Sequence, residues 1–410
     1  MKKIIGSALM LLFSITLLFG CDSKDSGGTT PEPENLDPVP ATKTNSMKLY
    51  AHYMPWFETK ESSGNNQWGY HWTMANQNPD IINPNGQRQI AAHYYPLIGP
   101  YHSGDHDVIE NHLLLMKYSG IDGILIDWYG TYNINDFAAL KQNTEQIVAV
   151  CAEIGLEYAI VYEDRFLNDI VNAGLAGTRA IGARTDMTYL KNNFFSQDNY
   201  IAVNGKPLLL NFGPITLMTE TEWTTAFSNL DPKPTFLTLW NNTAAGNNAS
   251  GEFAWVYENN TNLQNFYQNR MPTLDVAMGS AYPGFNDFYQ EGGTSTVIGW
   301  TIPHGTTLQT TLQMAQTAGV DMLQLVTWND FGEGTMLEPT VEFGYDYVNQ
   351  IKTFAGVQNT GNVFEDIGRL FEYRKQYSGN STIQQKLTKA SKYFASMQPD
   401  KAILELDGIE

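Results

Sequence analysis

The sequence predicts an α/β fold: a single (β/α)8 barrel of the TIM type, with a long insertion after the first strand and a C-terminal helical extension. Eight short apolar runs alternate with segments whose apolar residues recur at helical spacing, and such alternation favours parallel strands joined by helices. Gly120, Gly155 and Gly319 each stand between a helical pattern and the next apolar run, where a glycine commonly ends a helix. Eight such units favour a closed barrel.

The strands are expected, in chain order, at residues 47–53, 123–128, 156–163, 207–212, 235–240, 253–257, 275–278 and 322–328, the sixth and seventh having the weakest patterns. Helical spacing predicts helices at 106–119, 143–154, 219–230 and 308–317. An open doubly wound sheet is the alternative, but no glycine-rich phosphate loop follows the first strand.

Composition divides the chain into four expected segments: a signal peptide at 1–20, a flexible tether at 21–46, the barrel at 47–357 and a helical extension at 358–410. The tether is rich in Pro, Gly, Ser, Thr and Asp, which cannot bury apolar surface. Residues 57–105 form an insertion rich in aromatics and His, expected on the catalytic face because it follows a strand. The tail from Phe364 to Met397 has the pattern of two helices, which we expect to pack on the barrel.

The N-terminus has the pattern of a secretory signal, because basic residues 2–3 precede an apolar stretch too short to span a membrane. Its Leu-Phe-Gly-Cys ending resembles a bacterial lipobox, which implies a lipidated Cys21 and a membrane-anchored, extracytoplasmic protein at the cell surface or the periplasmic face. The acidic residues that follow loosely resemble export signals of Bacteroidetes lipoproteins. An ordinary signal peptide with a chance cysteine is the alternative. Cys151 lies in an apolar helical pattern and is expected to be buried.

The overall charge argues against nucleic acid as a partner. Lys and Arg total 24 against 43 Asp and Glu, a formal net charge of −19, and this field repels phosphate backbones. Aromatics make up 12% of the residues while charged residues make up only 16%, and aromatic faces suit stacking on sugars as well as core packing. We expect a monomer that needs no cofactor.

Polar and aromatic side chains recur at the C-terminal ends of the predicted strands, where barrel enzymes place their chemistry. A structural role is the alternative at any one strand, because Asp and Asn begin loops and Trp fills barrel ends. Recurrence at neighbouring strand ends favours a binding site. We expect substrate contacts from Tyr53, Trp56, His102, Asp127, Trp128, Tyr129, Glu163, Asn211, Trp240 and Asn329.

Asp330 and Glu333 are the strongest catalytic candidates, because they lie three residues apart in a glycine-containing turn after the last strand. Glycosidic cleavage needs one protonated carboxyl group, to donate to the leaving oxygen, and one ionised carboxylate, to act as base or nucleophile. The alternative is a loop in which Asp330 caps a helix and Glu333 pairs with an arginine.

Six of the seven histidines fall between residues 52 and 112. They show no tight metal-ligand spacing, so we expect no metal site and instead expect hydrogen bonds to sugar hydroxyls.

Three stretches together resemble glycoside hydrolases of the family 71/99-like group: residues 99–123, residues 126–130, and residues 327–339, which begin Thr-Trp-Asn-Asp-Phe-Gly-Glu-Gly. The resemblance spans residues 47–354 and implies a (β/α)8 enzyme that cleaves α-linked glycans, α-mannan or α-glucan, with endo action. It assigns Glu333 as the acid and Asp330 as the base. Family 99 has Glu at the position of Asp330, and the form found here looks closer to family 71, which cleaves α-1,3-glucan.

A non-catalytic glycan-binding lipoprotein on a barrel scaffold is the competing hypothesis. Such a protein would keep Trp56, Trp128 and Trp240 as stacking platforms but would need no carboxylate pair. The presence of both Asp330 and Glu333 favours the enzyme. A purely structural lipoprotein would leave the polar strand ends without a role.

Overall fold

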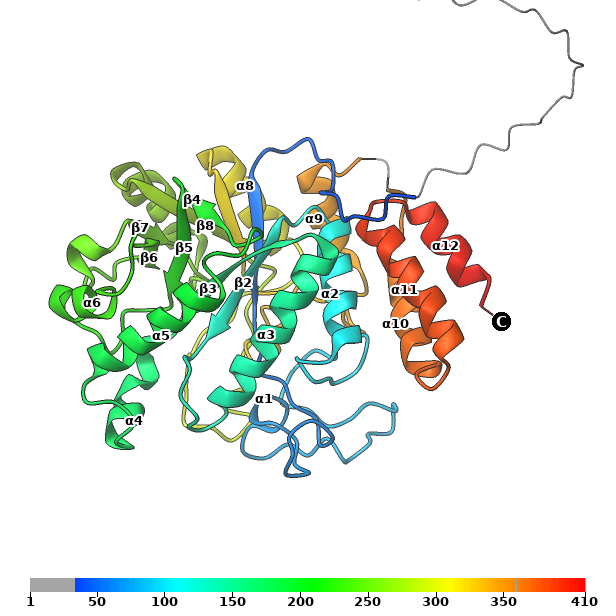
Figure 1. Cartoon of the computed structure of the whole chain (residues 1–410), viewed down its shortest axis with the longest axis horizontal. Coiled ribbons are helices and arrows are strands. Elements are labelled where there is room, and N and C mark those ends of the chain that lie inside the picture. Colours follow the sequence, from blue (N-terminus) through cyan, green and yellow to red (C-terminus); the bar gives the residue numbers. More distant parts are fainter. Residues whose placement is uncertain (1–33, 359, 410) are drawn as a thin grey trace, which may run out of the picture. The chain divides into compact units, whose positions relative to one another are not determined.

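The computed structural model describes residues 34–358 and 360–409, and its centre is a closed barrel of eight parallel strands (Figure 1). Each strand pairs with its neighbours in parallel register, and β3 pairs with β5 to close the ring. The predicted (β/α)8 barrel is therefore confirmed. The strands are β1 Lys48–Tyr53, β2 Gly123–Trp128, β3 Glu157–Tyr162, β5 Lys206–Asn211, β6 Thr235–Leu239, β7 Gly251–Phe253, β8 Val276–Ala281 and β9 Met322–Leu325.

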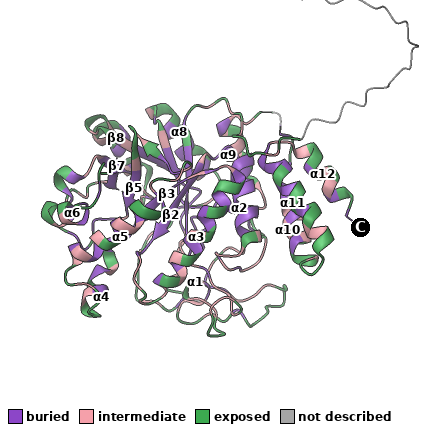
Figure 2. Cartoon of the chain, in the orientation of Figure 1, coloured by how far each residue is buried: buried purple, intermediate pink, exposed green. Residues whose placement is uncertain are grey.

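Helices cover the outside of the barrel, and burial is concentrated on the strands and on the helix faces that contact them (Figure 2). Gly155 and Gly319 end two of these helices with positive φ angles of 77° and 68°, as expected for the left-handed residue that closes a helix. The main outer helices are α2 His106–Tyr118, α3 Phe137–Ile154, α5 Arg179–Asn193, α6 Glu220–Ala226, α7 Asn260–Asn265, α8 Thr307–Ala318 and α9 Asp346–Ala355.

The shorter elements and some boundaries differ from the predicted ones. The predicted strand at 253–257 is found three residues long at Gly251–Phe253, and β9 ends at Leu325 instead of continuing to residue 328. Of the main outer helices, α5, α7 and α9 were not predicted. The remaining elements are β4 Ala202–Val203, which pairs antiparallel with β5, and the short helices α1 Tyr70–Thr73, α4 Leu167–Asn172, η1 Asp164–Phe166, η2 Gly246–Asn248, η3 Phe266–Arg270 and η4 Met271–Thr273.

The insertion after β1 is held at the C-terminal end of the barrel by a buried aromatic cluster. Trp72, in α1, stacks on Phe57 with ring centroids 4.1 Å apart. The indole N–H of Trp72 donates to the carbonyl of Tyr101 at 2.8 Å, so this large side chain is buried with its polar atom satisfied. The insertion therefore lies on the face of the barrel where it was predicted.

The C-terminal extension consists of α10 Phe364–Gln376, α11 Ser381–Ala395 and α12 Pro399–Asp407. The first two are the two helices predicted between Phe364 and Met397, and α12 follows them. Figure 1 shows α10 and α11 beside α2. Arg374 of α10 forms a buried ion pair with Glu110 of α2 at 2.8 Å, and the hydroxyl of Tyr118 donates to the carbonyl of Phe394 at 3.1 Å. These contacts attach the extension to the barrel.

The predicted signal peptide at 1–20 and Cys21 lie outside the described residues, but the end of the predicted tether does not. The backbone N–H of Val39 donates to Ala395, and that of Thr44 donates to Gly356. The Lys43 ammonium pairs with Asp122, before β2. Residues 39–46 are therefore fixed to the folded domain, and the predicted tether boundary at 46 is too late in the chain.

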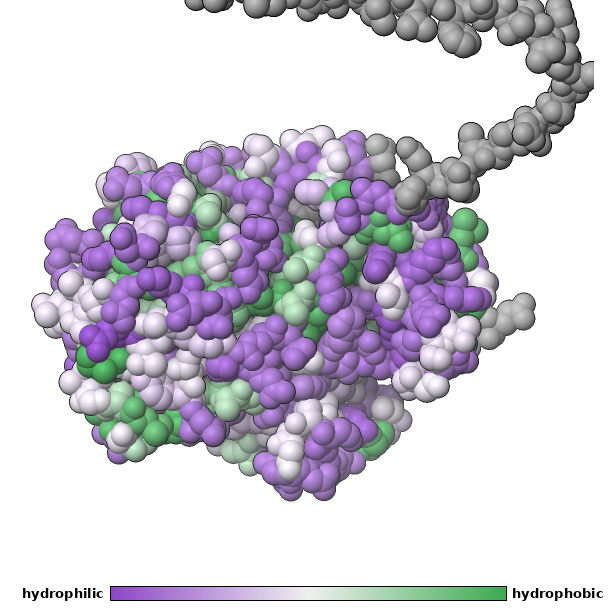
Figure 3. Space-filling model, in the orientation of Figure 1, coloured by the Kyte–Doolittle hydropathy of each residue, from purple (hydrophilic) through white to green (hydrophobic). Residues whose placement is uncertain are grey.

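The face of the molecule seen in Figure 3 is mainly hydrophilic, with small and scattered hydrophobic areas. In the described part of the chain, no helix has both the length and the apolar character needed to cross a membrane.

Trp128, predicted to contact sugar, is a core residue instead. It is fully buried and stacks against Tyr189 of α5, with ring centroids 5.9 Å apart and planes at 18°. It also contacts Tyr162 of β3. The side chain therefore fills the layer between the barrel and its outer helices, and it is not among the residues that line the cleft described below.

We predict that Trp128→Ala lowers the free energy of unfolding by about 3–5 kcal/mol, because it leaves a cavity in that layer. Urea unfolding followed by circular dichroism measures the change. Trp128→Phe keeps most of the buried ring and should lose less. Unchanged stability in the alanine variant would contradict the core role.

Candidate active site

A cleft of about 180 Å³ opens at the C-terminal ends of the strands. The predicted site residues that line it are Trp56, Asp127, Tyr129, Glu163, Asp330 and Glu333. His52 and His71, two of the histidines expected to contact sugar, also line it. Lining residues that were not predicted include Tyr70, Arg165, Phe212, Trp255 and Tyr289. The insertion contributes Tyr70, His71 and Met74, so it forms part of the wall.

Asp330 and Glu333 lie in the turn that follows β9, and this turn is fixed by its own hydrogen bonds. One carboxylate oxygen of Asp330, Oδ1, accepts from the backbone N–H of Glu333 at 2.9 Å. The backbone N–H of Asp330 donates to the Thr327 hydroxyl at 2.8 Å. On Glu333, Oε1 accepts from the Tyr289 hydroxyl at 3.1 Å. The alternative in which Asp330 caps a helix is not found, because residues 331–334 form a turn and not a helix. Glu333 hydrogen-bonds to a tyrosine and not to an arginine.

Burial raises the pKa of both carboxyl groups, and their different neighbours set the two values apart. Desolvation, followed by the nearby Asp330 charge, raises the pKa of Glu333 to about 8. Desolvation also raises the pKa of Asp330, but only to about 6, because the backbone N–H groups of Glu333 and Gly332 stabilise its charged form. At neutral pH, Glu333 holds a proton while Asp330 is mainly ionised.

A second acidic group, Asp127 with Glu163, lines the same cleft from the ends of β2 and β3. Desolvation raises the pKa of Glu163 to about 7, although its ion pair with Arg165 opposes the rise. Desolvation and the Glu163 charge raise the pKa of Asp127 above its usual range. Its Oδ2 is buried and has no hydrogen-bond partner within the described residues, which leaves this acceptor for a ligand.

The histidines of the cleft are neutral, because burial lowers the pKa of both His52 and His71 to about 3. The His71 ring stacks on Trp56 with centroids 4.1 Å apart, so one face of the indole is already covered. Trp56 can offer only its edge or its other face to a ligand. Among the described residues, no three His, Cys, Asp or Glu side chains are arranged so that they could hold a metal ion.

Two predicted site residues stabilise the cleft from behind without lining it. Asn329 Oδ1 accepts from the backbone N–H of Met54 at 2.8 Å, and its Nδ2 donates to the Met54 carbonyl at 3.0 Å. Asn211 Nδ2 donates to the carbonyl of Tyr162 at 2.7 Å. Both side chains are buried and join neighbouring strand ends.

Three more predicted residues also lie outside the cleft lining. The hydroxyl of Tyr53 hydrogen-bonds to His112 at 2.9 Å, and His102 hydrogen-bonds to Asn143 at 3.0 Å. Trp240 makes edge contacts with neighbouring aromatic rings and does not reach the carboxylates. The expected contacts of these three side chains with sugar are not supported by their positions.

No family model matches this chain. A glycoprotein endo-α-1,2-mannosidase-like protein of Mus musculus is 27% identical over 104 residues, and this match covers 24% of the chain and about a quarter (23%) of the length of that relative.

Among solved structures, the family 99 endo-α-mannosidase of Bacteroides thetaiotaomicron aligns with a TM-score of 0.58 at 16% identity, over 79% of this chain and 99% of that protein. The chain has the fold of this endo-α-mannosidase. The same enzyme in complex with bis-tris-propane aligns with a TM-score of 0.57 at 15% identity, over 82% of this chain and 99% of its own. A glycoside hydrolase-like protein aligns with a TM-score of 0.52 at 14% identity, over 78% of this chain and 97% of that protein. The predicted resemblance is confirmed in the fold.

We predict that Glu333→Gln becomes more stable relative to the wild type as the pH rises. The pKa of Glu333 in the folded protein, about 8, lies above the usual value of 4.5. Between these two pH values the folded state keeps a proton on Glu333 that the unfolded state has released. The wild type therefore loses stability as the pH rises from about 4.5 to about 8, and the glutamine variant lacks this loss.

Melting temperatures of both proteins from pH 5 to pH 9 test this prediction. The control is Glu372→Gln, which changes an exposed glutamate of α10. Parallel curves for the wild type and Glu333→Gln would contradict it.

Proposed function

We propose that this protein is a glycoside hydrolase that cleaves α-linked glycans, with α-mannan as the first candidate substrate and endo action as the expected mode. The observation that supports this most directly is the pair Asp330 and Glu333, which lines a cleft at the catalytic end of a barrel. The pKa values of the two groups lie on opposite sides of neutral pH. One protonated and one ionised carboxyl group is the combination that glycosidic cleavage requires.

In this mechanism Glu333 is the general acid. Its raised pKa keeps it protonated near neutral pH, and the Tyr289 hydroxyl donates to Oε1 and fixes the carboxyl group. The proton passes from the carboxyl group to the oxygen of the glycosidic bond as that bond breaks, which removes the need to expel an alkoxide.

Asp330 is the base. Its Oδ1 accepts the N–H of Glu333, and this hydrogen bond fixes the carboxylate in the turn. Two targets fit a carboxylate here. In the first, Asp330 takes a proton from a water, whose oxygen attacks the anomeric carbon as the protonated leaving group departs; this inverts the anomeric centre, as the likeness to family 71 suggests. In the second, Asp330 takes the proton of the sugar's 2-hydroxyl, whose oxygen displaces the protonated leaving group to give an anhydro sugar; a water then opens that ring at the anomeric carbon, with overall retention, as the family 99 fold suggests. Proton NMR of the first-formed anomer distinguishes the two.

The choice of sugar rests on two opposing observations. The solved structures with this fold are named as endo-α-mannosidases, which favours α-mannan. The aspartate at position 330 shortens the base by one methylene relative to family 99 and favours α-glucan. We place α-mannan first, because the fold similarity extends over most of the chain.

A non-catalytic glycan-binding protein on the same scaffold is the second candidate, and the positions of its expected platforms count against it. Trp128 is fully buried in the layer outside the barrel, and Trp240 does not line the cleft. Trp56 remains, with one face covered by His71. Aromatic rings and four carboxyl groups line the cleft together, and a binding protein would have no need for the carboxyl groups.

We predict that Glu333→Gln lowers kcat on α-mannan or α-glucan oligosaccharides by several orders of magnitude, on the order of 10³-fold or more, because protonation of the leaving oxygen is lost. An aryl glycoside with a good leaving group needs no proton and should lose far less. Hydrolysis rates on the two substrates, with product sizes read by chromatography, measure the difference.

Asp330→Asn is the companion variant. It should be inactive on both substrates, because the base acts on the water or the 2-hydroxyl and a better leaving group does not replace it. Equal losses on the two substrates in Glu333→Gln would remove Glu333 as the acid. Wild-type rates in Asp330→Asn would direct attention to Glu163, the next ionisable carboxyl group of the cleft.

We also propose that the protein is anchored in a membrane through a lipid on Cys21, a proposal that rests on the sequence alone. Replacement of Cys21 by Ala should release the protein from the membrane fraction of expressing bacteria. Equal membrane association of Cys21→Ala would refute the anchor.

A further inference from the structure

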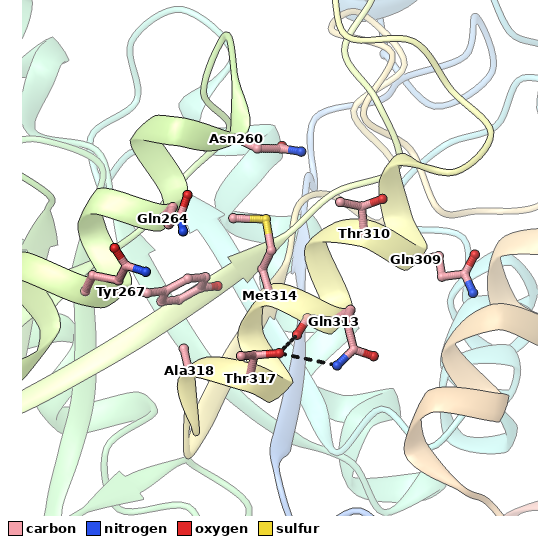
Figure 4. Close-up of a pocket in the computed structure, with 10 residues that line it drawn as sticks. Asn260, Gln264, Tyr267, Gln309, Thr310, Gln313, Met314, Thr317 and Ala318 are labelled. Atoms are coloured by element: carbon pink, nitrogen blue, oxygen red, sulfur yellow. Dashed lines mark hydrogen bonds between the residues drawn. The ribbon is translucent and has the colours of Figure 1, made fainter.

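A second and larger cavity, a groove of about 620 Å³, lies on the side of the barrel between α7 with η3 and α8 (Figure 4). It extends from Gln309 near the start of α8 to Ala318, the last residue of that helix. None of its lining residues lines the carboxylate cleft. We call it the α7–α8 groove, and its size falls in the usual range for small-molecule sites.

The α7–α8 groove is uncharged, although the chain carries a formal net charge of −19. None of the ten side chains that line it is ionisable at neutral pH, and five are amides: Asn260, Gln264, Gln268, Gln309 and Gln313. The whole of α8, twelve residues long, has no acidic or basic side chain. Exposed helix faces usually carry charges, so this neutral surface is unusual for a surface helix.

The amides of the α7–α8 groove are available to a ligand. The side-chain Nε2 of Gln313 donates to the Thr317 hydroxyl at 3.4 Å, as Figure 4 shows, which leaves the side-chain oxygen Oε1 unused within the described residues. Within the described residues, the side chains of Gln264 and Gln309 make no hydrogen bond. Met314 lies between the two helices (Figure 4), where its flexible thioether can adapt to an apolar ring face. The groove thus offers donors, acceptors and an apolar floor.

The wall opposite α8 has an irregular backbone. Residues Phe266–Arg270 form a π-helix, η3, directly after α7, and π-helical turns are rare and frequently found at functional sites. Tyr267, within this turn, is held by a hydrogen bond from its hydroxyl to the carbonyl of Ser280 at 2.9 Å. The turn therefore places a fixed aromatic ring and Gln268 along the groove.

We propose that the α7–α8 groove is a second carbohydrate-binding site, which takes a neutral α-linked oligosaccharide apart from the carboxylate cleft. Sugar hydroxyls both donate and accept hydrogen bonds, and amides match both roles. An anionic or cationic ligand would need an opposite charge, and the lining provides none. Gln309 and Gln313 also border an adjoining groove of about 490 Å³ between α8 and α9, so a longer chain can continue across α8.

Binding by the α7–α8 groove needs no hydrolysis, so the test uses the full chain with Glu333→Gln to prevent cleavage. Native gels that contain soluble α-mannan or soluble α-glucan report binding as retarded migration. The groove variant is Gln264→Ala with Gln313→Ala, and its apparent dissociation constant for the retarding polymer should rise about tenfold, because two amide hydrogen bonds are lost.

The matched control is Gln376→Ala with Gln385→Ala, which removes two exposed helical glutamines from α10 and α11. It should migrate like its parent. Equal retardation of the groove variant and its parent, or no retardation of the parent by either polymer, would overturn the proposal.

The same substitutions in the chain that keeps Glu333 should leave hydrolysis of short oligosaccharides unchanged, because none of the groove residues lines the cleft. A failure of the proposed hydrolase function would appear as absent hydrolysis in the wild type. It would leave the retardation result intact, so the two proposals fail separately.

Discussion

The carboxylate turn owes its position to a hydrogen-bonded junction between the ends of β9 and β1. The Asn329 amide accepts from the N–H of Met54 and donates to its carbonyl. The neighbouring N–H of Trp328 donates to the carbonyl of His52 at 2.6 Å. These backbone groups lie at or just beyond the end of the hydrogen-bonded pairing of β1 with β9 and would otherwise lack partners. An unpaired buried polar group is costly in free energy. Asp330 follows directly, so its position is set relative to the strand that leads to Trp56.

Water exclusion then determines the chemistry of that turn. Four carboxyl groups line one small cleft, and Arg165 is the one permanently charged cation among the lining residues. Desolvation is the first cause of each raised carboxyl pKa in the cleft, and the insertion that supplies Tyr70 and His71 contributes to it. The aromatic insertion and the acidic strand ends therefore act together. Without the insertion over the cleft, the carboxyl groups would be in contact with water and would titrate closer to their usual pKa values.

The strongly patterned elements could be predicted from the sequence, and β2 was found at its predicted limits. The position of Trp128 could also have been predicted, because successive side chains on a strand point to opposite faces. If Asp127 faces the cleft, Trp128 must face the outer helices. Other features could not be predicted. Tyr289 and Arg165 lie on loops or turns whose paths follow from tertiary packing, and α5 has little amphipathic pattern because Gly, Thr and Asn interrupt it.

The aspartate at position 330 has both a structural and an electrostatic role. Its carboxylate accepts the backbone N–H of Glu333 and shapes the turn. That same hydrogen bond stabilises its negative charge, and the charge is the second cause of the raised pKa of Glu333. The structural role thus produces the electrostatic one. A glutamate here, one methylene longer, would reach further towards a sugar but would fit the turn less well, because Asp and Asn are the carboxyl and amide side chains that close turns by bonding to nearby backbone groups. The shorter side chain therefore ties the ionised group to the turn that carries its protonated partner.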